Sequence, residues 1–251
     1  MKISIITVCF NAEKTIRDTI ESVLAQTHND IEYIIVDGQS TDGTLAIVNE
    51  YQGRISKVIS EKDRGIYDAM NKGINSATGD VVGILNSDDF FAGDNVIKIV
   101  ANAFNSDTDA IFADLIYVNQ ADTSIPSRYY SSRGFKKWKM RFGFMVPHPT
   151  FYARRSLFQE HGCYEISYRV AADFELMARM FVTGIKYKRL DAVLVKMREG
   201  GISSSGLLWR LHQNVEIARA CRKNGIFTLS PLMLIKLPFK LASFWKKSKH
   251  G

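Results

Sequence analysis

The chain has 251 residues, of which 46% are hydrophobic and 24% are charged. This length and composition exclude a disordered chain and a small fold that depends on disulfides. The three cysteines are widely spaced, form no zinc-binding pattern and suit free thiols in a reducing compartment. The apolar run after Met1 is too short for a signal peptide, and no apolar run is long enough to span a membrane, so we expect a cytoplasmic protein.

The net charge of +7 is concentrated in two segments that contain no acidic residue. Residues 123–159 contain eight lysines and arginines, and the chain after Glu216 contains eight more. The rest of the chain is net acidic. The basic character is therefore local, and it indicates partners for particular regions of the protein.

The first 118 residues alternate between apolar runs and segments with helical spacing of apolar residues. Strands are expected at residues 3–9, 31–36, 55–60, 81–85 and 110–118, and helices at 14–26, 45–51, 66–77 and 94–104. Continuous apolar runs are typical of strands buried on both faces of a sheet. The alternation predicts an α/β fold with a mostly parallel sheet flanked by helices.

The pattern loosens after residue 120. A strand followed by a helix is expected over 151–161, a helix over 171–182, a strand over 186–197, and a long amphipathic helix over 207–223 that Gly225 ends. We therefore expect a domain at 1–205, with halves at 1–120 and 121–205. A C-terminal extension, 206–251, would hold the amphipathic helix and a basic tail.

Polar residues follow three of the predicted strands: Asn11, Asp37 and the pair Asp88-Asp89. Ligands of parallel sheets bind beyond the carboxyl ends of the strands, so these residues mark the expected site. The chain has no GxxxxGK[ST] motif, and no GxGxxG motif follows the first strand. P-loop phosphate binding is therefore excluded, and a dinucleotide dehydrogenase is disfavoured.

Two adjacent carboxylates repel each other unless a cation or solvent screens them, and their hard oxygens suit Mg²⁺ or Mn²⁺. Asp88-Asp89 could equally cap the helix expected at 94–104. Asp37 and Asp63 fit turns as well as a ligand site. Asp173 could be a dipole partner at a helix start or a general base. His148, between two prolines, is a lone histidine, a type that is more often structural.

Four segments in order resemble the successive motifs of glycosyltransferase family 2. They are residues 7–11 (TVCFN), 36–44 (VDGQSTDGT), 60–73 (SEKDRGIYDAMNKG) and 85–89 (LNSDD). Residues 147–152 and 171–176 resemble the acceptor-side motifs of the same family. The resemblance implies a Rossmann-like GT-A fold and a transferase that inverts the anomeric centre.

The resemblance also implies roles for individual residues. The residues expected to bind the nucleotide are Thr7, Val8, Phe10, Asn11, Asp37, Asp63, Asn86 and Asp88. Asp88 and Asp89 jointly would hold Mn²⁺ or Mg²⁺, because Asn86 stands at the first acidic position of the family's DxD motif. Asp173 would deprotonate the acceptor hydroxyl. His148 and Arg198 are candidates for contact with the acceptor or the diphosphate.

The expected activity is sugar transfer from a UDP-hexose or UDP-N-acetylhexosamine to a lipid-linked saccharide in polysaccharide biosynthesis. A nucleotidyltransferase is an alternative, although the turn at residues 9–13 lacks the glycines and cations that grip a triphosphate. A non-catalytic nucleotide-sugar-binding protein is another. A homodimer is left open.

Residues 232–247 mix apolar and aromatic residues with lysines. Such a segment suits the surface of an anionic membrane and predicts peripheral association with the inner face of the plasma membrane. A disordered or self-packing tail is the alternative. Nucleic acid is disfavoured, because the half that would bind the nucleotide is acidic.

Overall fold

A computed structural model describes residues 1–200 and 206–228. The first part of the chain alternates strands and helices: β1 (Ile3–Cys9), α1 (Ile16–Leu24), β2 (Ile31–Asp37), α2 (Thr44–Glu50), β3 (Lys57–Ser60), α3 (Ile66–Ser76), β4 (Val81–Ile84), β5 (Asp89–Phe91), α4 (Val96–Ala103) and β6 (Ala110–Val118). The second part contains β7 (Pro126–Tyr130), the 3₁₀ turns η1 (Lys137–Phe142) and η2 (His148–Thr150), β8 (Tyr152–Arg154), α5 (Arg155–His161), α6 (Ala172–Val182), β9 (Tyr187–Arg198) and α7 (Gly206–Lys223).

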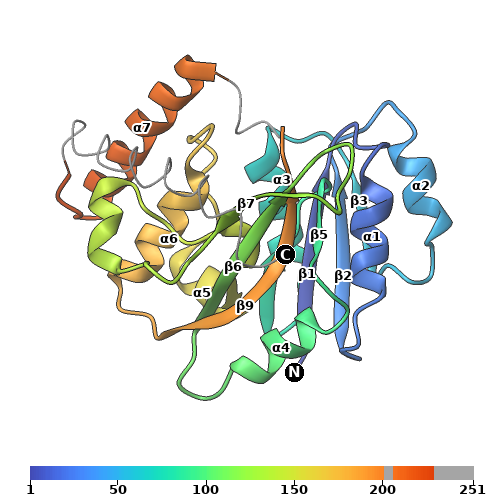
Figure 1. Ribbon diagram of the computed structural model, residues 1–251, viewed down its shortest axis with the longest axis horizontal. Helices are drawn as coiled ribbons and strands as arrows, with labels where there is room; N and C mark the ends of the chain where they lie inside the picture. Colours follow the sequence, from blue (N-terminus) through green and yellow to red (C-terminus); the bar gives the residue numbers. More distant parts are fainter. Residues whose placement is uncertain (201–205, 229–251) are drawn as a thin grey trace.

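Nine strands of the described chain form one curled sheet, in the order β3-β2-β1-β4-β8-β6-β9-β5, with β7 paired to β6. Strands β1 to β4 pair in parallel, as does β6 with β9. Strand β8 is antiparallel to both β4 and β6, and it joins the two halves of the sheet. Figure 1 shows α1 and α2 at one end of the molecule and α5, α6 and α7 at the other. The predicted α/β class, with helices flanking the sheet, is confirmed.

The sheet is buried on both faces, as its apolar strands predict. Ile6 of β1 packs in a cluster with α3, α6 and α7, whereas its neighbour Ile5 packs in a second cluster with α1 and α4. Successive side chains of a strand point to opposite faces, so one strand contributes to both cores. The strand ends that carry the polar residues are therefore held by packing from both sides.

Helix α7 belongs to the same packed body as α6. Ile217, Ala218, Ala220 and Cys221 of α7 are buried in the cluster that contains α6. Gly225 follows the helix with φ +69°, a left-handed conformation that suits glycine. Within residues 1–200 and 206–228, no helix is long and apolar enough to cross a membrane. The tail that is expected to contact a membrane, residues 232–247, lies outside the described residues.

Candidate active site

The ends of β1, β2 and β3 lie at one level, because Cys9 pairs with Asp37 and Asp37 pairs with Ser60. Asp37 is fully buried, and its carboxylate accepts hydrogen bonds from Ser60 Oγ at 2.7 Å and from the backbone N–H of Ser40 at 3.2 Å. The Asp37 side chain thus holds the loop that follows β2.

An exposed ring and a carboxylate lie side by side above this level. Phe10 is 62% exposed, which is unusual for a phenylalanine. A Cβ atom added at Gly38 would overlap Asp63 Oδ2 and would lie 3.5 Å from Phe10 Cδ2. Gly38 therefore allows Asp63 to lie against the loop next to the Phe10 ring. This pairing offers a stacking surface and a hydrogen-bond acceptor, which are the two features that a nucleobase needs.

The other residues predicted to line the base have different surroundings. The side chains of Thr7 and Val8 are buried in the sheet, so only their backbone can reach a ligand. Asn11 has φ +50° and is exposed, and its side-chain oxygen accepts a hydrogen bond from Thr41 N at 2.8 Å. The Asn11 N–H donates to Ser40 Oγ at 2.8 Å. Asn11 therefore connects the turn after β1 with the loop after β2.

Asp88 directly precedes β5 and Asp89 is its first residue, and this position excludes the alternative of a cap on α4, which begins only at Val96. Asp89 is fully buried and Asp88 is half-buried. Burial raises the pKa of both carboxyls, and that of Asp89 well above its usual range, with the charge of Asp88 adding to the effect. These two groups would ionise readily only beside a positive charge.

Two oxygen atoms at this turn are candidates to bind such a positive charge. Asn86 Oδ1 and Asp89 Oδ1 are buried, and neither has a hydrogen-bond partner in the described part of the chain. Buried acceptors are rarely left without a donor, and amide and carboxylate oxygens are the ligands that Mg²⁺ prefers. No group of three or more His, Cys, Asp or Glu side chains gathers as a metal site among residues 1–200 and 206–228. The turn therefore fits a divalent cation that takes its remaining ligands from elsewhere, such as phosphate oxygens.

The structure brings Arg198 of β9 to the same turn. Arg198 is buried, and its Nη1 donates to the backbone oxygen of Asp88 at 2.7 Å. The guanidinium also forms an ion pair with Asp18 of α1 and lies 4.9 Å from the centre of the Phe90 ring. The described contacts of Arg198 hold the acidic turn in place, and its expected contact with a diphosphate stays a prediction.

Asp173 lies in the first turn of α6, as predicted. Its Oδ1 accepts a hydrogen bond from the N–H of Phe174 at 2.7 Å and lies 3.5 Å from the hydroxyl of Tyr67. Burial raises the pKa of Asp173 to about 6. A carboxyl with this pKa is largely ionised at neutral pH but is a stronger base than an exposed aspartate.

His148 lies near this site in a neutral form. Its Nε2 is 2.7 Å from the hydroxyl of Tyr164, and burial lowers the pKa of His148 to about 4. Tyr164 stacks on Tyr67, with ring centres 5.6 Å apart. His148 is thus connected to the Asp173 region through two tyrosines, and at neutral pH it brings no positive charge for a diphosphate.

Residues that position Asp173 were missed in the sequence. Glu216 of α7 accepts hydrogen bonds from three successive backbone N–H groups, those of residues 169, 170 and 171, at 2.8 to 2.9 Å. Tyr67 of α3 donates to the backbone oxygen of Val170 at 2.8 Å. Asn71, one turn later in α3, bonds both the N–H and the C=O of Tyr164 at 2.8 Å. The only sequence signal was that Glu216 is the last acidic residue of the chain.

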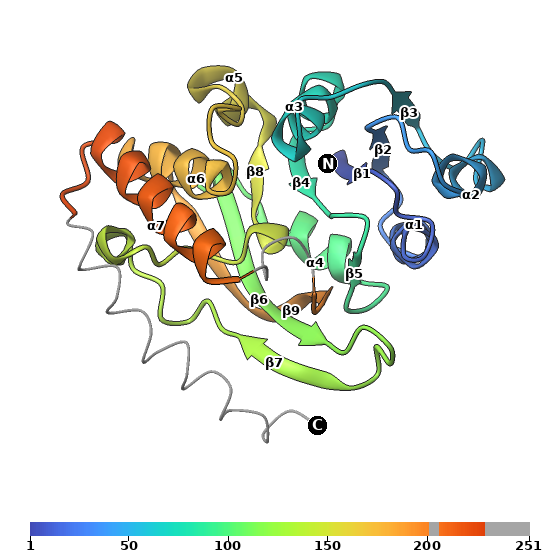
Figure 2. The same ribbon diagram turned by 90° about the horizontal axis from the view of Figure 1, so that it is seen from above.

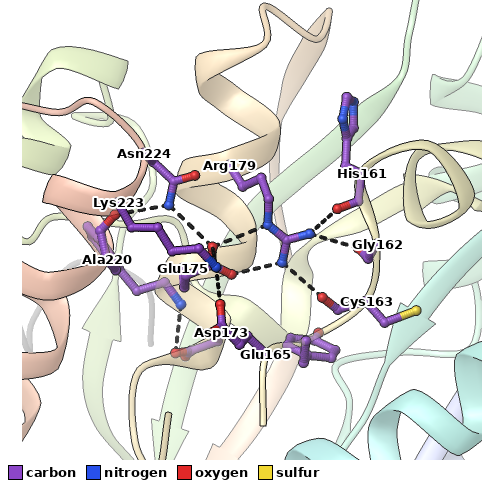
Figure 3. A network of polar contacts seen from close by, with 12 residues as sticks. His161, Gly162, Cys163, Glu165, Asp173, Glu175, Arg179, Ala220, Lys223 and Asn224 are labelled. Atoms are coloured by element: carbon purple, nitrogen blue, oxygen red, sulfur yellow. Dashed lines mark hydrogen bonds and ion pairs between the residues drawn. The ribbon is translucent and has the colours of Figure 1, made fainter. Parts of the chain in front are cut away.

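A polar network fixes α6 on its other side (Figure 3). The guanidinium of Arg179 pairs with the buried carboxylate of Glu175 at 2.8 Å and donates to the backbone oxygens of residues 161, 162 and 163. Lys223 and Asn224, at the end of α7, also contact Glu175, at 3.4 and 3.3 Å. A buried charge is stable only when it is paired in this way. The start of α6 is therefore held by α3, α5 and α7 together.

Comparisons with known proteins identify a family model and relatives that match this chain. The family model for glycosyl transferase family 2 matches residues 4–162. A PGL/p-HBAD biosynthesis glycosyltransferase of Mycobacterium bovis is 30% identical over 208 residues, which cover 80% of this chain and 79% of the relative. An uncharacterized glycosyltransferase of Mycobacterium tuberculosis is 33% identical over 184 residues, which cover 70% of this chain and 68% of the relative.

Solved structures share the fold at low sequence identity. S. aureus TarS 1-349 in complex with UDP-GlcNAc has a TM-score of 0.70 at 18% identity, covering 100% of this chain and 77% of that one. The mannosyltransferase PcManGT from Pyrobaculum calidifontis, in complex with GDP-Man and Mn²⁺, has a TM-score of 0.66 at 17% identity, covering 98% of this chain and 73% of that one. The matched family model and the curated relatives show that the chain belongs to glycosyltransferase family 2.

Proposed function

We propose that the chain transfers a sugar from a UDP-hexose or UDP-N-acetylhexosamine to a hydroxyl of a lipid-linked saccharide, with inversion and with a divalent cation at the acidic turn. The observation that supports this most is the pair of buried oxygens without donors, Asn86 Oδ1 and Asp89 Oδ1. The solved relatives in complex with UDP-GlcNAc and with GDP-Man and Mn²⁺ make a nucleotide-sugar donor and a metal reasonable for this chain.

Binding would place the nucleoside at Phe10 and Asp63, with the diphosphate toward the turn of Asp88 and Asp89. A bound Mg²⁺ or Mn²⁺ would neutralise charge on the departing nucleoside diphosphate. The carboxylate of Asp173 would accept the proton of the acceptor hydroxyl. Because its pKa is about 6, the carboxylate is ionised at neutral pH and ready to take that proton. Attack from the side opposite the leaving group would invert the anomeric carbon.

The experiment that tests this proposal replaces both carboxylates. The double variant Asp88→Asn with Asp89→Asn should lose Mn²⁺-dependent UDP binding in calorimetry and should lose sugar transfer. Asp94→Asn is the matched control, because Asp94 is an exposed carboxylate five residues further along the same segment. Metal-dependent binding that survives in the double variant would contradict the assignment of the acidic turn.

The alternatives from the sequence predict different products. A nucleotidyltransferase would release pyrophosphate from a nucleoside triphosphate, and a binding protein would release nothing. In a screen of nucleotide sugars with Mn²⁺ and lipid-diphosphate acceptors, only a glycosyltransferase releases a nucleoside diphosphate. The same assay with nucleoside triphosphates and sugar phosphates separates the other two, because only a nucleotidyltransferase then releases pyrophosphate. We also propose that residues 232–247 bring the protein to the inner face of the plasma membrane, where a lipid-linked acceptor would lie.

A further inference from the structure

The 3₁₀ turn η1 presents a tryptophan to solvent. Trp138 is 57% exposed, although tryptophan is among the residues that gain most from burial. Its ring contacts Phe142 edge to face, with centres 5.9 Å apart, and Lys139 Nζ lies 5.8 Å from the ring centre. The turn itself is anchored, because Met140 is fully buried in the core. Trp138 is thus held outward by a fixed piece of structure.

Unpaired positive charges surround this ring. The exposed residues Lys136, Lys137 and Arg141 flank it along the chain, and none forms an ion pair with a described residue. No acidic residue occurs anywhere from 123 to 159. An aromatic ring among lysines, with no carboxylate to neutralise them, suits an interface between water and an anionic surface.

The end of the described chain meets the same turn. Cys221 Sγ contacts the backbone oxygen of Met140 at 3.6 Å, and Thr228 Oγ1 donates to the backbone oxygen of Arg141 at 2.6 Å. Phe227, beside it, is 67% exposed. Figures 1 and 2 both show the yellow-green turn η1 against the red end of α7. The described chain therefore ends, at residue 228, beside η1, and described residues of the two acid-free segments meet there.

We propose that this surface, formed by residues 136–142 and Phe227, binds the anionic phospholipids of a membrane, with Trp138 inserted at the level of the headgroups. Cations beside the membrane attract anionic lipid, and the Trp138 and Phe227 side chains supply apolar area. This inference extends the proposed function: a folded contact in the acceptor half would orient the enzyme on its membrane, in addition to the tail. Its test measures lipid binding without turnover, so its failure is distinguishable from failure of the proposed activity.

The test is sedimentation of the full chain with vesicles of phosphatidylcholine alone and of phosphatidylcholine with phosphatidylglycerol. Lys136→Glu with Lys137→Glu should weaken binding to the anionic vesicles by about 25-fold or more, from about fivefold per basic residue. Trp138→Ala should weaken it by about tenfold. The matched control is Arg54→Glu with Lys98→Glu, which reverses two exposed cations of the other half that have no ion pair with a described residue. This control should change binding little.

Two outcomes would overturn the proposal. Equal sedimentation of the lysine variant and its control would mean that any binding comes from the tail or from net charge. If the wild-type protein does not sediment with anionic vesicles, the surface does not bind lipid, and a protein or saccharide partner is favoured. If Trp138→Ala fails to fold, the lysine variant still tests the proposal, because both of its lysines are exposed. Thermal melts of all four proteins show whether each one is folded.

Discussion

Replacing Asp173 by asparagine should move activity and stability in opposite directions. In the folded protein, burial raises the pKa of this carboxyl from 3.8 to about 6. Below about pH 4 the group is protonated in both the folded and the unfolded chain, so burial costs nothing extra. Above pH 6 it is ionised in both, and the folded state carries a penalty of up to about 3 kcal/mol, at about 1.36 kcal/mol per pKa unit. Asparagine has the same shape without the charge.

We therefore expect Asp173→Asn to be about 1–3 kcal/mol more stable than the wild type at pH 7.5 and equally stable near pH 3.5. The gain should lie toward the lower end of this range, because the side chain is only partly buried. Urea denaturation across this pH range measures the difference. Calorimetry and transfer assays on the same samples should show UDP affinity close to wild type and no sugar transfer.

Three results would refute this reasoning. A stability difference that does not change between pH 3.5 and 7.5 would show that burial does not raise the pKa of Asp173. Surviving transfer would show that Asp173 is not the base. A loss of UDP affinity would place Asp173 on the donor side. Asp94→Asn, which removes an exposed carboxylate, should change neither stability nor turnover.

Two further predictions concern other groups. The Tyr67 hydroxyl lowers the pKa of Asp173, so Tyr67→Phe should move the acidic limb of the pH–rate profile to higher pH by roughly a few tenths of a unit. The control Tyr164→Phe should leave this limb in place. Equal profiles for the two variants would contradict the prediction. Burial would raise the pKa of Glu32, but hydrogen bonds to its carboxylate, led by that from Ser4, outweigh burial and lower the pKa to about 2. The ionised carboxylate therefore stabilises the folded state fully above about pH 4.5, and this stabilisation is lost as the pH falls toward 2. Glu32→Gln should therefore cost about 2 kcal/mol in urea denaturation at pH 7 and much less at pH 2.5; an equal cost at both values would refute it.

The elements with local signals were predictable. β1 is a continuous apolar run, and α1 repeats its buried residues at helical spacing, so both were expected close to their observed bounds. β5 and β7 were not expected. β5 has three residues and exists because it pairs with β9, more than a hundred residues later. β7 is a polar strand at the edge of β6, where the sequence has no clear alternation.

Some residues of the candidate site could likewise be predicted from the sequence, and others could not. Asn11, Asp37 and Asp88-Asp89 could be found because the rule about strand ends depends only on the order of strands and helices. Glu216 and Tyr67 could not, because each acts through contacts with residues more than forty positions away. A glutamate in a long amphipathic helix is ordinarily solvated, so nothing local marks Glu216 as the acceptor for three backbone N–H groups.

Helix α3 has a consequence for exchanging parts between relatives. By sequence it belongs to the half that would bind the donor, but Tyr67 and Asn71 hold the loop that precedes Asp173 in the other half. A chimera joined at residue 120 would combine one protein's α3 with another protein's loop and would disturb the acceptor side even if the donor side remained intact. Donor preference should therefore be transplanted with α3 and the loop of residues 163–173 as a single unit.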